Sequence, residues 1–457
     1  MKKINLDCDS RLEIVLSFPE SKAAFEECLP HMAPVIEQQK AVYGFTLRRI
    51  ADYANGAITD EQLQTLEQKL KALEIMAEDH MVSGGSYEES QPLTKAAAEI
   101  VEGERYTSIR PGQVFRDTEG KRIQAHGGAM FYEDGVYYWY GENKDRTDGK
   151  CPVWTWGIKA YISRDLYNWE DLGFIIPPNL MDPGSGLYPE KHVDRPHIIK
   201  CSATGKYVCW IKLSGEEECF LVLTADTFTG PYEIVRENYR PLDMKVGDFD
   251  VIVDDDGKAY LYMDGNHIGI IGMTLSEDYL SVEKEISRQY MDLHAPFCRE
   301  GVTLFSHGGK HFMLTSGMSG YVPNKSDAAV TDDWKKPFVS IGDPHVNDES
   351  RASFNSQISC VFKVEGTELY VSMADRWVPG YPMDGKKSEM FERAIASHFD
   401  PEHYQASPQE NEEYMNSPML ESADTSMADY VWLPVTIEDG KPAIHWYDEW
   451  RVEDFIE

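Results

Sequence analysis

The chain has 457 residues, of which 42% are apolar, and its 78 acidic residues outnumber the 44 basic ones, giving a formal net charge of −34. This length allows two or three domains with well-formed cores. Such a negative field repels phosphate backbones and anionic membranes, so we exclude nucleic acid and membrane surfaces as partners. A neutral ligand such as a sugar is compatible with it.

The N-terminal segment lacks the features of an export signal. Residues 1–22 contain no apolar core followed by a small-residue cleavage site, and no stretch approaches the roughly 18 apolar residues that span a bilayer. We therefore expect a cytoplasmic protein. The eight cysteines are scattered, with no CxxC pair and no zinc-site spacing, which predicts reduced and mostly buried side chains.

Residues 10–100 have a helical pattern. Thr59, followed by two acidic residues, marks a helix start. Apolar side chains then recur at helical spacing and define one buried stripe, formed by Leu63, Leu66, Leu70 and Leu73. A Gly/Ser/Pro-rich interruption at 82–92 precedes one more helical run at 93–104. We predict a small all-α domain over residues 1–107 that holds no catalytic group and either caps the next domain or pairs two chains.

From about residue 108 the chain changes to short strands and turns rich in aromatic residues. One turn glycine precedes a strand at steps of 70, 52, 52 and 57 residues, at Gly135, Gly205, Gly257, Gly309 and Gly366. A second shared turn carries an acidic residue at steps of 61, 52 and 55, at Asp165, Asp226, Asp278 and Asp333. Five units of about 50 residues therefore account for a second domain over residues 108–457, and a polar insertion near 383–428 interrupts the last unit.

A polar side chain also recurs at the start of each of the last four units. These residues are Asp194, Asp248, Glu300 and Gln357, at steps of 54, 52 and 57. A strand repeat of this length is typical of propeller blades, and equivalent positions in successive blades meet at one end of the central channel. The sequence thus predicts a mainly β fold, a five-bladed β-propeller preceded by a small all-α domain, with these four side chains in one pocket.

Seven ordered segments of the predicted propeller carry a family resemblance. They are QAHGGAMFYEDGVYYWYGENKD, VDRPHIIKCSATGKYVCW, MKVGDFDVIVDDDGKAYLY, REGVTLFSHGGKHFMLTSGMSGYVPN, SFNSQISCVF, MADRW and YVWLPVTIEDGKPAIHW. Over about residues 108–452 the chain resembles glycoside hydrolase family 43, and most closely the subfamily that contains exo-β-1,3-galactanases. The helical N-terminal region lies outside the resemblance.

The resemblance implies an inverting glycosidase with its active site at the mouth of the channel. Glu300, in REG where the family has REAP, matches the general acid, and Asp248, in GDFD, matches the carboxylate that tunes and orients that acid. Most branches place an aspartate base at the start of the first blade, where this chain reads IQAHGG. The galactanase-like branch shares this absence and has a glutamine at the position of Gln357. Asp194 stands where that branch has the longer glutamate in ERPK.

The chemistry of inverting hydrolysis supports the same roles. One carboxyl must give a proton to the leaving oxygen while a water attacks from the opposite face of the sugar. Neighbouring carboxylates repel one another, which raises the pKa of at least one of them and keeps it protonated near neutrality. We expect Glu300 to donate this proton and the Gln357 amide to hold the water. The alternatives are solvated surface charges for the acids and a strand cap for Gln357.

Other residues in these segments are expected to bind the sugar. They are Glu142, His126, Tyr321, Asn324, Arg376, Trp377 and Trp432, and the tryptophan rings offer faces for stacking on the sugar. Structural alternatives stay open for several of them. Glu142 would pair with a nearby arginine, His126 would be a hydrogen-bonded core residue, and the tryptophans would belong to the core.

The expected function is the exo-acting, inverting release of galactose from β-1,3-linked galacto-oligosaccharides. The alternatives are a β-xylosidase or α-L-arabinofuranosidase of the same family, a phosphorylase, and a non-catalytic glycan-binding propeller. A phosphorylase needs a cluster of basic residues to hold phosphate, whereas the unit starts carry acids. We expect no required cofactor and assign no metal ligand. Calcium occurs in the channel of some relatives, but the chain has no EF-hand-like run.

Overall fold

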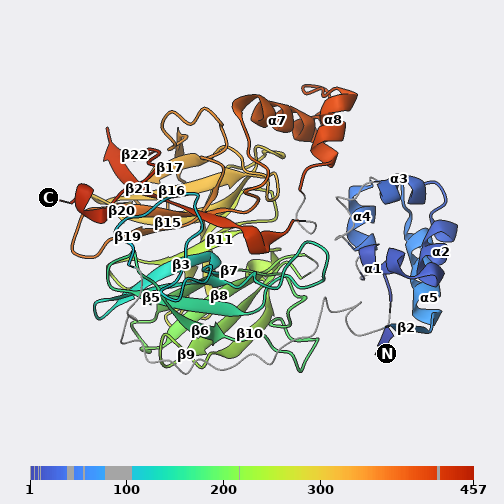
Figure 1. Ribbon diagram of the computed structural model, residues 1–457, viewed down its shortest axis with the longest axis horizontal. Coiled ribbons are helices and arrows are strands. Elements are labelled where there is room, and N and C mark those ends of the chain that lie inside the picture. Colours follow the sequence, from blue (N-terminus) through green and yellow to red (C-terminus); the bar gives the residue numbers. More distant parts are fainter. Residues whose placement is uncertain are drawn as a thin grey trace.

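The computed structural model describes residues 2–4, 6–8, 10, 12–38, 46–54, 57–77, 105–215, 217–418 and 423–456. Within these residues, five sheets of four antiparallel strands each are arranged around one axis as the blades of a propeller (Figure 1). The predicted five-bladed β-propeller is therefore confirmed.

Each blade is built from four strands that are consecutive in the sequence. Blade 1 comprises β3 (His126–Glu133), β4 (Val136–Glu142), β5 (Ile158–Ser163) and β6 (Glu170–Ile176); blade 2 comprises β7 (Val193–Lys200), β8 (Tyr207–Leu213), β9 (Cys219–Ala225) and β10 (Glu233–Tyr239). Blade 3 comprises β11 (Phe249–Val253), β12 (Ala259–Asp264), β13 (Ile270–Leu275) and β14 (Val282–Gln289); blade 4 comprises β15 (Arg299–His307), β16 (Lys310–Gly317), β17 (Asp327–Thr331) and β18 (Val339–Gly342). Blade 5 comprises β19 (Gln357–Lys363), β20 (Tyr370–Arg376), β21 (Asp429–Glu438) and β22 (Lys441–Ile444).

The first strand of each blade lines the central channel. Strand β3 contacts β7, β7 contacts β11, and the series continues through β15 and β19 back to β3. The ring is also closed near the ends of the domain, where Ile109 and Trp450 exchange two backbone hydrogen bonds of 2.8 and 3.0 Å. Residues at the starts of the first strands are thereby brought to one end of the channel.

The two repeated turns lie where the sequence pattern places them. The five turn glycines connect the first and second strands of successive blades, and each adopts a positive φ that favours glycine. The four acidic residues follow the third strands; Oδ1 of Asp165, for example, accepts hydrogen bonds from the backbone nitrogens of Tyr167 and Asn168 at 2.9 and 2.8 Å. Both turn predictions are confirmed.

The predicted insertion separates β20 from β21 and contains two helices, which the sequence analysis did not predict. They are α7 (Gly385–Phe399) and α8 (Pro408–Met415), and α7 begins at Asp384, whose side chain accepts from the backbone nitrogen of Lys387. Phe391 and Ala394 of α7 pack against Val322, in the loop after β16. The insertion therefore supports a loop at the channel mouth.

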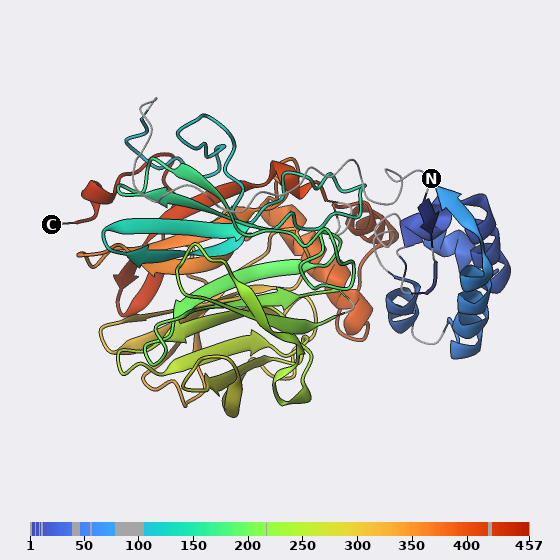
Figure 2. The ribbon, with the colours of Figure 1, turned by 90° about the horizontal axis from the view of Figure 1, so that it is seen from below.

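The N-terminal region forms a separate group of helices beside the propeller (Figures 1 and 2). Its elements are β1 (Lys2–Ile4), α1 (Leu12–Ser17), α2 (Pro19–Cys28), α3 (Ala33–Gln38), α4 (Leu47–Tyr53), α5 (Asp60–Ala72) and β2 (Ile75–Ala77). The short antiparallel sheet of β1 and β2 was not predicted. The predicted interruption at 82–92 and the helical run at 93–104 lie outside the described residues.

The predicted start and buried stripe of α5 are confirmed. The Thr59 hydroxyl accepts from the backbone nitrogen of Gln62 at 3.2 Å, and the Gln62 side chain accepts from the Thr59 nitrogen at 3.0 Å, which forms a capping box. Leu63, Leu66 and Leu70 are buried, and Leu73 packs against the same cluster. This cluster holds only residues of the N-terminal region.

All eight cysteines are free thiols, five of them buried and three partly buried. This agrees with the reduced, mostly buried side chains that their spacing predicts. In the described part of the chain, no helix is long and apolar enough to cross a membrane.

Candidate active site

The starts of the first strands and the ends of the second strands meet at one end of each blade. The cross-strand pairs in four blades are His126 with Glu142, Asp194 with Lys212, Glu300 with Ser316, and Gln357 with Asp375. In blade 3, which has a regular ladder, the backbone nitrogen of Asp264 donates to the carbonyl oxygen of Asp248 at 2.7 Å. The channel mouth is therefore ringed by ten polar or charged side chains, two from each blade.

A β-bulge follows the first of these residues in blades 1, 2 and 4. The residues directly after them, Gly127, Arg195 and Gly301, have φ values of 58°, 50° and 60°, and the strand register shifts at each site. A bulge re-aims the neighbouring side chains, as expected next to an active site. At Gly301 a Cβ atom would lie 2.6 Å from Oγ of Ser316 and 3.1 Å from Nε2 of Gln357, so only glycine fits beside these groups.

Asp248 is a buried carboxylate with cationic partners. Its Oδ1 accepts from Nζ of Lys212 at 2.6 Å, its Oδ2 accepts from the backbone nitrogen of Gly301 at 3.0 Å, and Nη1 of Arg195 lies 3.8 Å away. Burial alone would raise the pKa of Asp248, but the charges of Lys212 and Arg195 together with these hydrogen bonds hold it well below its ordinary value. Asp248 is therefore ionised throughout the physiological range.

Glu300 has the opposite electrostatic environment. Its burial, followed by the negative charge of Asp248, raises the pKa of Glu300 well above its ordinary value, although Lys212 and Arg195 oppose the shift. The residue is mostly buried but remains partly exposed at the mouth. Within the described residues its carboxyl makes no side-chain hydrogen bond to the protein. A carboxyl whose pKa is raised and which is partly accessible from the mouth can donate its proton to a bound ligand.

Asp194 belongs to the same cluster, and both of its oxygens are engaged. Oδ1 accepts from Nε1 of Trp154 at 2.6 Å, Oδ2 accepts from the hydroxyl of Ser214, and Nζ of Lys212 lies 3.9 Å from Oδ2. Lys212 therefore stands between Asp194 and Asp248. Through these contacts Asp194 positions the side chains of Trp154 and Lys212 at the channel mouth.

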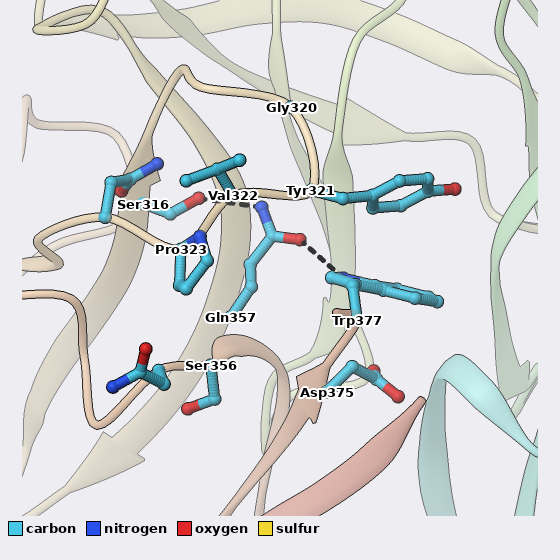
Figure 3. Close-up of a pocket in the computed structure, with 11 residues that line it drawn as sticks. Ser316, Gly320, Tyr321, Val322, Pro323, Ser356, Gln357, Asp375 and Trp377 are labelled. Atoms are coloured by element: carbon cyan, nitrogen blue, oxygen red, sulfur yellow. Dashed lines mark hydrogen bonds between the residues drawn. The ribbon is translucent and has the colours of Figure 1, made fainter. Parts of the chain in front are cut away.

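Gln357 lines a pocket at the channel mouth (Figure 3). Its Nε2 donates to Oγ of Ser316 at 2.9 Å, and Nε1 of Trp377 donates to its Oε1 at 3.3 Å. The pocket is formed by the loop after β16, the segment that leads into β19 and the end of β20, through Ser316, Gly320, Tyr321, Val322, Pro323, Asn324, Asn355, Ser356, Gln357, Asp375 and Trp377.

Three of the predicted sugar-binding residues line this pocket. The ring of Trp377 lies tilted by 40° against that of Tyr321, with 5.0 Å between their centroids, and the ring centroid of Tyr321 also lies 6.1 Å from that of Trp154 of blade 1. Asn324 is held by its own loop, since its Oδ1 accepts from the nitrogen of Gly317 at 2.6 Å and its Nδ2 donates to the carbonyl oxygen of Gly317 at 2.7 Å. Asn324 thus shapes the loop that carries Tyr321.

Glu142 and His126 are buried and paired, as their structural alternatives anticipated. Oε1 of Glu142 accepts from the backbone nitrogen of Arg195 at 2.8 Å, and Oε2 lies 2.7 Å from Nζ of Lys144, so its charged partner is a lysine instead of the expected arginine. Burial raises the pKa of Glu142 to about 7. His126 is fully buried, and its Nδ1 hydrogen-bonds with Oδ1 of Asp375 at 2.8 Å.

Arg376 and Trp432 do not line the pocket. The guanidinium of Arg376 donates to the carbonyl oxygens of Phe354 and Asn355 at 2.9 and 3.2 Å, and so holds the turn ahead of β19. Trp432 is fully buried in the core between blades 1 and 5, where its ring lies 4.5 Å from that of Trp139. The prediction that Trp432 binds sugar is wrong, because its position three residues inside β21 points it into the packing between blades.

Several site residues were missed by the sequence analysis. Four of them lie at the ends of second strands: Lys212, Asp264, Ser316 and Asp375. The fifth is Arg195, which directly follows Asp194 in the first strand of blade 2. The turn glycine of each hairpin locates these second-strand residues only approximately, because a bulge shifts the strand pairing by one residue in blades 2 and 4. Among the described residues, no group of three or more His, Cys, Asp or Glu side chains is placed to hold a metal ion. That no cofactor is required stays a prediction.

The carboxyls of Glu300 and Asp248 have pKa values that their environments shift in opposite directions. The pKa of Glu300 is raised and that of Asp248 is lowered, which is the division that general-acid cleavage of a glycosidic bond requires. At the channel mouth of a five-bladed propeller, this pair matches the acid pair of a glycoside hydrolase.

Comparisons with known proteins agree with this class. The family model for glycosyl hydrolases family 43 matches residues 128–349. A solved β-1,3-galactosidase of this family is 29% identical with a TM-score of 0.60, and the match covers 77% of this chain and 65% of that one. A second family 43 β-1,3-galactosidase, solved with galactodeoxynojirimycin, is 25% identical with a TM-score of 0.59, covering 75% of this chain and 100% of that one. Over residues 128–349 the chain is similar to glycoside hydrolase family 43.

A more distant structure shows the same fold. An exo-β-1,3-galactanase from Phanerochaete chrysosporium, solved with β-1,3-galactotriose, is 23% identical with a TM-score of 0.59, and the match covers 76% of this chain and 68% of that one. No curated protein sequence matches the chain.

Proposed function

We propose that this glycoside hydrolase is inverting and exo-acting, and that it releases galactose from β-1,3-linked galacto-oligosaccharides. The observation that carries the proposal is the pair of opposite pKa shifts in Glu300 and Asp248. Glu300 donates its proton to the leaving oxygen, and Asp248 keeps that proton in place by its charge. The similarity to two β-1,3-galactosidases, at 29% and 25% identity, supports galactose as the sugar.

The inverting mechanism is supported by the state of the other groups at the mouth. A retaining enzyme needs a nucleophilic carboxylate about 5–5.5 Å from the acid. Both oxygens of Asp194 and of Asp248 already accept hydrogen bonds, and Gln357 carries an amide in place of a carboxylate. Gln357 instead offers an acceptor and a donor that orient a water for attack on the sugar.

Exo action is supported by a contact across the mouth. Tyr321 comes from the loop between β16 and β17 of blade 4, whereas Trp154 comes from the loop between β4 and β5 of blade 1. Their ring centroids lie 6.1 Å apart, with 25° between the planes. These loops belong to blades that are not adjacent, so their contact narrows the site to a pocket that accepts the end of a chain.

Hydrolysis is favoured over phosphorolysis because the basic groups near the site are already paired. Lys212 binds Asp248, Lys144 pairs with Glu142, and the guanidinium of Arg195 donates to the carbonyl oxygen of Val302 at 2.9 Å. A phosphate would have to displace one of these partners.

The test is release of galactose from β-1,3-galactobiose, measured with and without phosphate, with proton NMR of the first product. We expect galactose as the α-anomer at a rate independent of phosphate. Release of the β-anomer would refute inversion, a requirement for phosphate would indicate a phosphorylase, and activity confined to aryl xylosides or arabinofuranosides would assign another sugar.

A further inference from the structure

The side-chain amide of Gln357 is held at both ends by residues from neighbouring strands (Figure 3). Ser316, near the end of β16, accepts from its Nε2 at 2.9 Å, and Trp377, directly after β20, donates from Nε1 to its Oε1 at 3.3 Å. An indole nitrogen can only donate, so Trp377 requires the oxygen of the amide on its side. The two contacts together select one of the two orientations of the amide.

The groups that hold Gln357 are themselves fixed. Ser316 is 4% exposed and lies opposite Glu300 in the strand register. Trp377 is 8% exposed, and its ring packs between those of His126 and Tyr321, at centroid distances of 5.6 and 5.0 Å. The hydrogen bonds from Gln357 to Ser316 and from Trp377 to Gln357 join side chains and are not part of the backbone hydrogen bonding of the blade. Both involve the Gln357 amide, which lies at the wall of the pocket.

An amide has two acceptor lone pairs on its oxygen and two hydrogens on its nitrogen. Trp377 uses one lone pair and Ser316 uses one hydrogen, which leaves one acceptor and one donor for a ligand. We propose that Ser316 and Trp377 are positioning residues that set the Gln357 amide so that this remaining pair orients the attacking water. The proposal rests on the proposed function, in which Gln357 holds that water. It gives Trp377 a role through its N–H in addition to its ring.

The kinetic test uses Ser316→Ala, which removes the acceptor, and Trp377→Phe, which removes the indole N–H and keeps an aromatic ring. We expect each variant to lower kcat by about tenfold, the effect of losing one orienting hydrogen bond. KM should change little in Ser316→Ala. Ser372→Ala is the matched control, since Ser372 is a buried serine of β20 that donates to the carbonyl oxygen of Leu433, away from the pocket. It should retain wild-type kinetics.

A second comparison tests whether the two residues act through Gln357. In a Gln357→Ala background, adding Ser316→Ala should cause no further loss of kcat, because the amide to be oriented is gone. An equal loss in both backgrounds, or a change in KM with kcat unaltered, would overturn the proposal.

The geometry also has a readout that does not depend on activity. The indole signal of Trp377 in a ¹H–¹⁵N spectrum, identified by its loss in Trp377→Phe, should shift in both Gln357→Ala and Ser316→Ala and stay in place in Ser372→Ala. An unmoved signal in Gln357→Ala would overturn the proposed positioning. If the wild type released no galactose, the proposed function would fail, while this spectrum would still decide whether the amide is held as described.

Discussion

The backbone nitrogen of Gly301 donates a hydrogen bond to Oδ2 of Asp248, 3.0 Å away. Gly301 directly follows Glu300, so the backbone of the proposed proton donor is tied to the carboxylate whose charge, after burial, raises the pKa of Glu300. Lys212 occupies the other oxygen of Asp248. The separation of the two acids is therefore set by the protein frame before any substrate binds, which is the preorganisation that electrostatic control of an acid requires.

The first prediction concerns the proton of Glu300. Glu300→Gln preserves the shape of the side chain and removes the proton, so hydrolysis of β-1,3-galactobiose should fall by about 10²–10⁴-fold. An activated aryl galactoside, whose leaving group needs little protonation, should lose much less. Steady-state kinetics on both substrates make the comparison, and an equal loss on the two would count against Glu300 as the acid.

The second prediction concerns the alkaline limb of the pH profile. Burial and the charge of Asp248 raise the pKa of Glu300, and the proposed mechanism uses its protonated form. Asp248→Asn removes that charge while Lys212 remains, so the pKa of Glu300 should fall and the alkaline limb of kcat/KM should move to lower pH. A lower rate with an unshifted profile would mean that Asp248 only positions the substrate.

The third prediction is a dependence of stability on pH. Because the pKa of Glu300 is raised on folding, its contribution is fully present below its unfolded pKa of about 4.3 and is lost as pH rises through the folded pKa. Glu300→Gln should therefore equal the wild type near pH 4 and become progressively more stable than it at higher pH. Urea unfolding across this range measures the difference.

Asp248→Asn supplies the opposite sign in the same experiment. The pKa of Asp248 is lowered on folding, so its contribution is present above its unfolded pKa of about 3.9 and is lost as pH falls through the folded pKa. This variant should be less stable than the wild type at neutral pH. If both variants changed stability equally at every pH, the two pKa shifts would be refuted.

The fourth prediction concerns the weak base. Gln357→Ala should reduce turnover by about 10²-fold or more, because the water loses its orienting amide. Gln357→Glu supplies a carboxylate of similar length and should retain or partly recover activity, with inverted product in both cases. Equal and complete loss in the two variants would place the water elsewhere.

The fifth prediction concerns the N-terminal helices. Their apolar cluster contains only residues of their own region, among them Leu66 and Leu70, so deleting residues 1–104 should leave a folded propeller with wild-type kcat. Aggregation of the truncated protein would indicate an apolar patch that the helices cover. A soluble truncation that binds sugar and lacks all activity would contradict the prediction.

The sequence by itself determined the number of blades and the end of the channel that carries the acids. Turn residues such as Gly257 and Asp278 recur once per unit because each blade repeats the same hairpins, and local turn chemistry is legible in a sequence. Glu300 and Asp248 could be predicted as partners because equivalent positions of successive blades converge.

Only the tertiary structure decided what surrounds these residues. Lys212 and Ser316 reach the site through cross-strand register, which bulges shift by a residue and which no periodicity shows. Trp377 and Trp432 look alike in the sequence, yet one lies at the pocket and the other in the core, because side chains along a strand alternate between faces and only packing between blades assigns the faces. How far along its strand a residue lies, and which residues of the next blade it contacts, are decided only when the blades pack together.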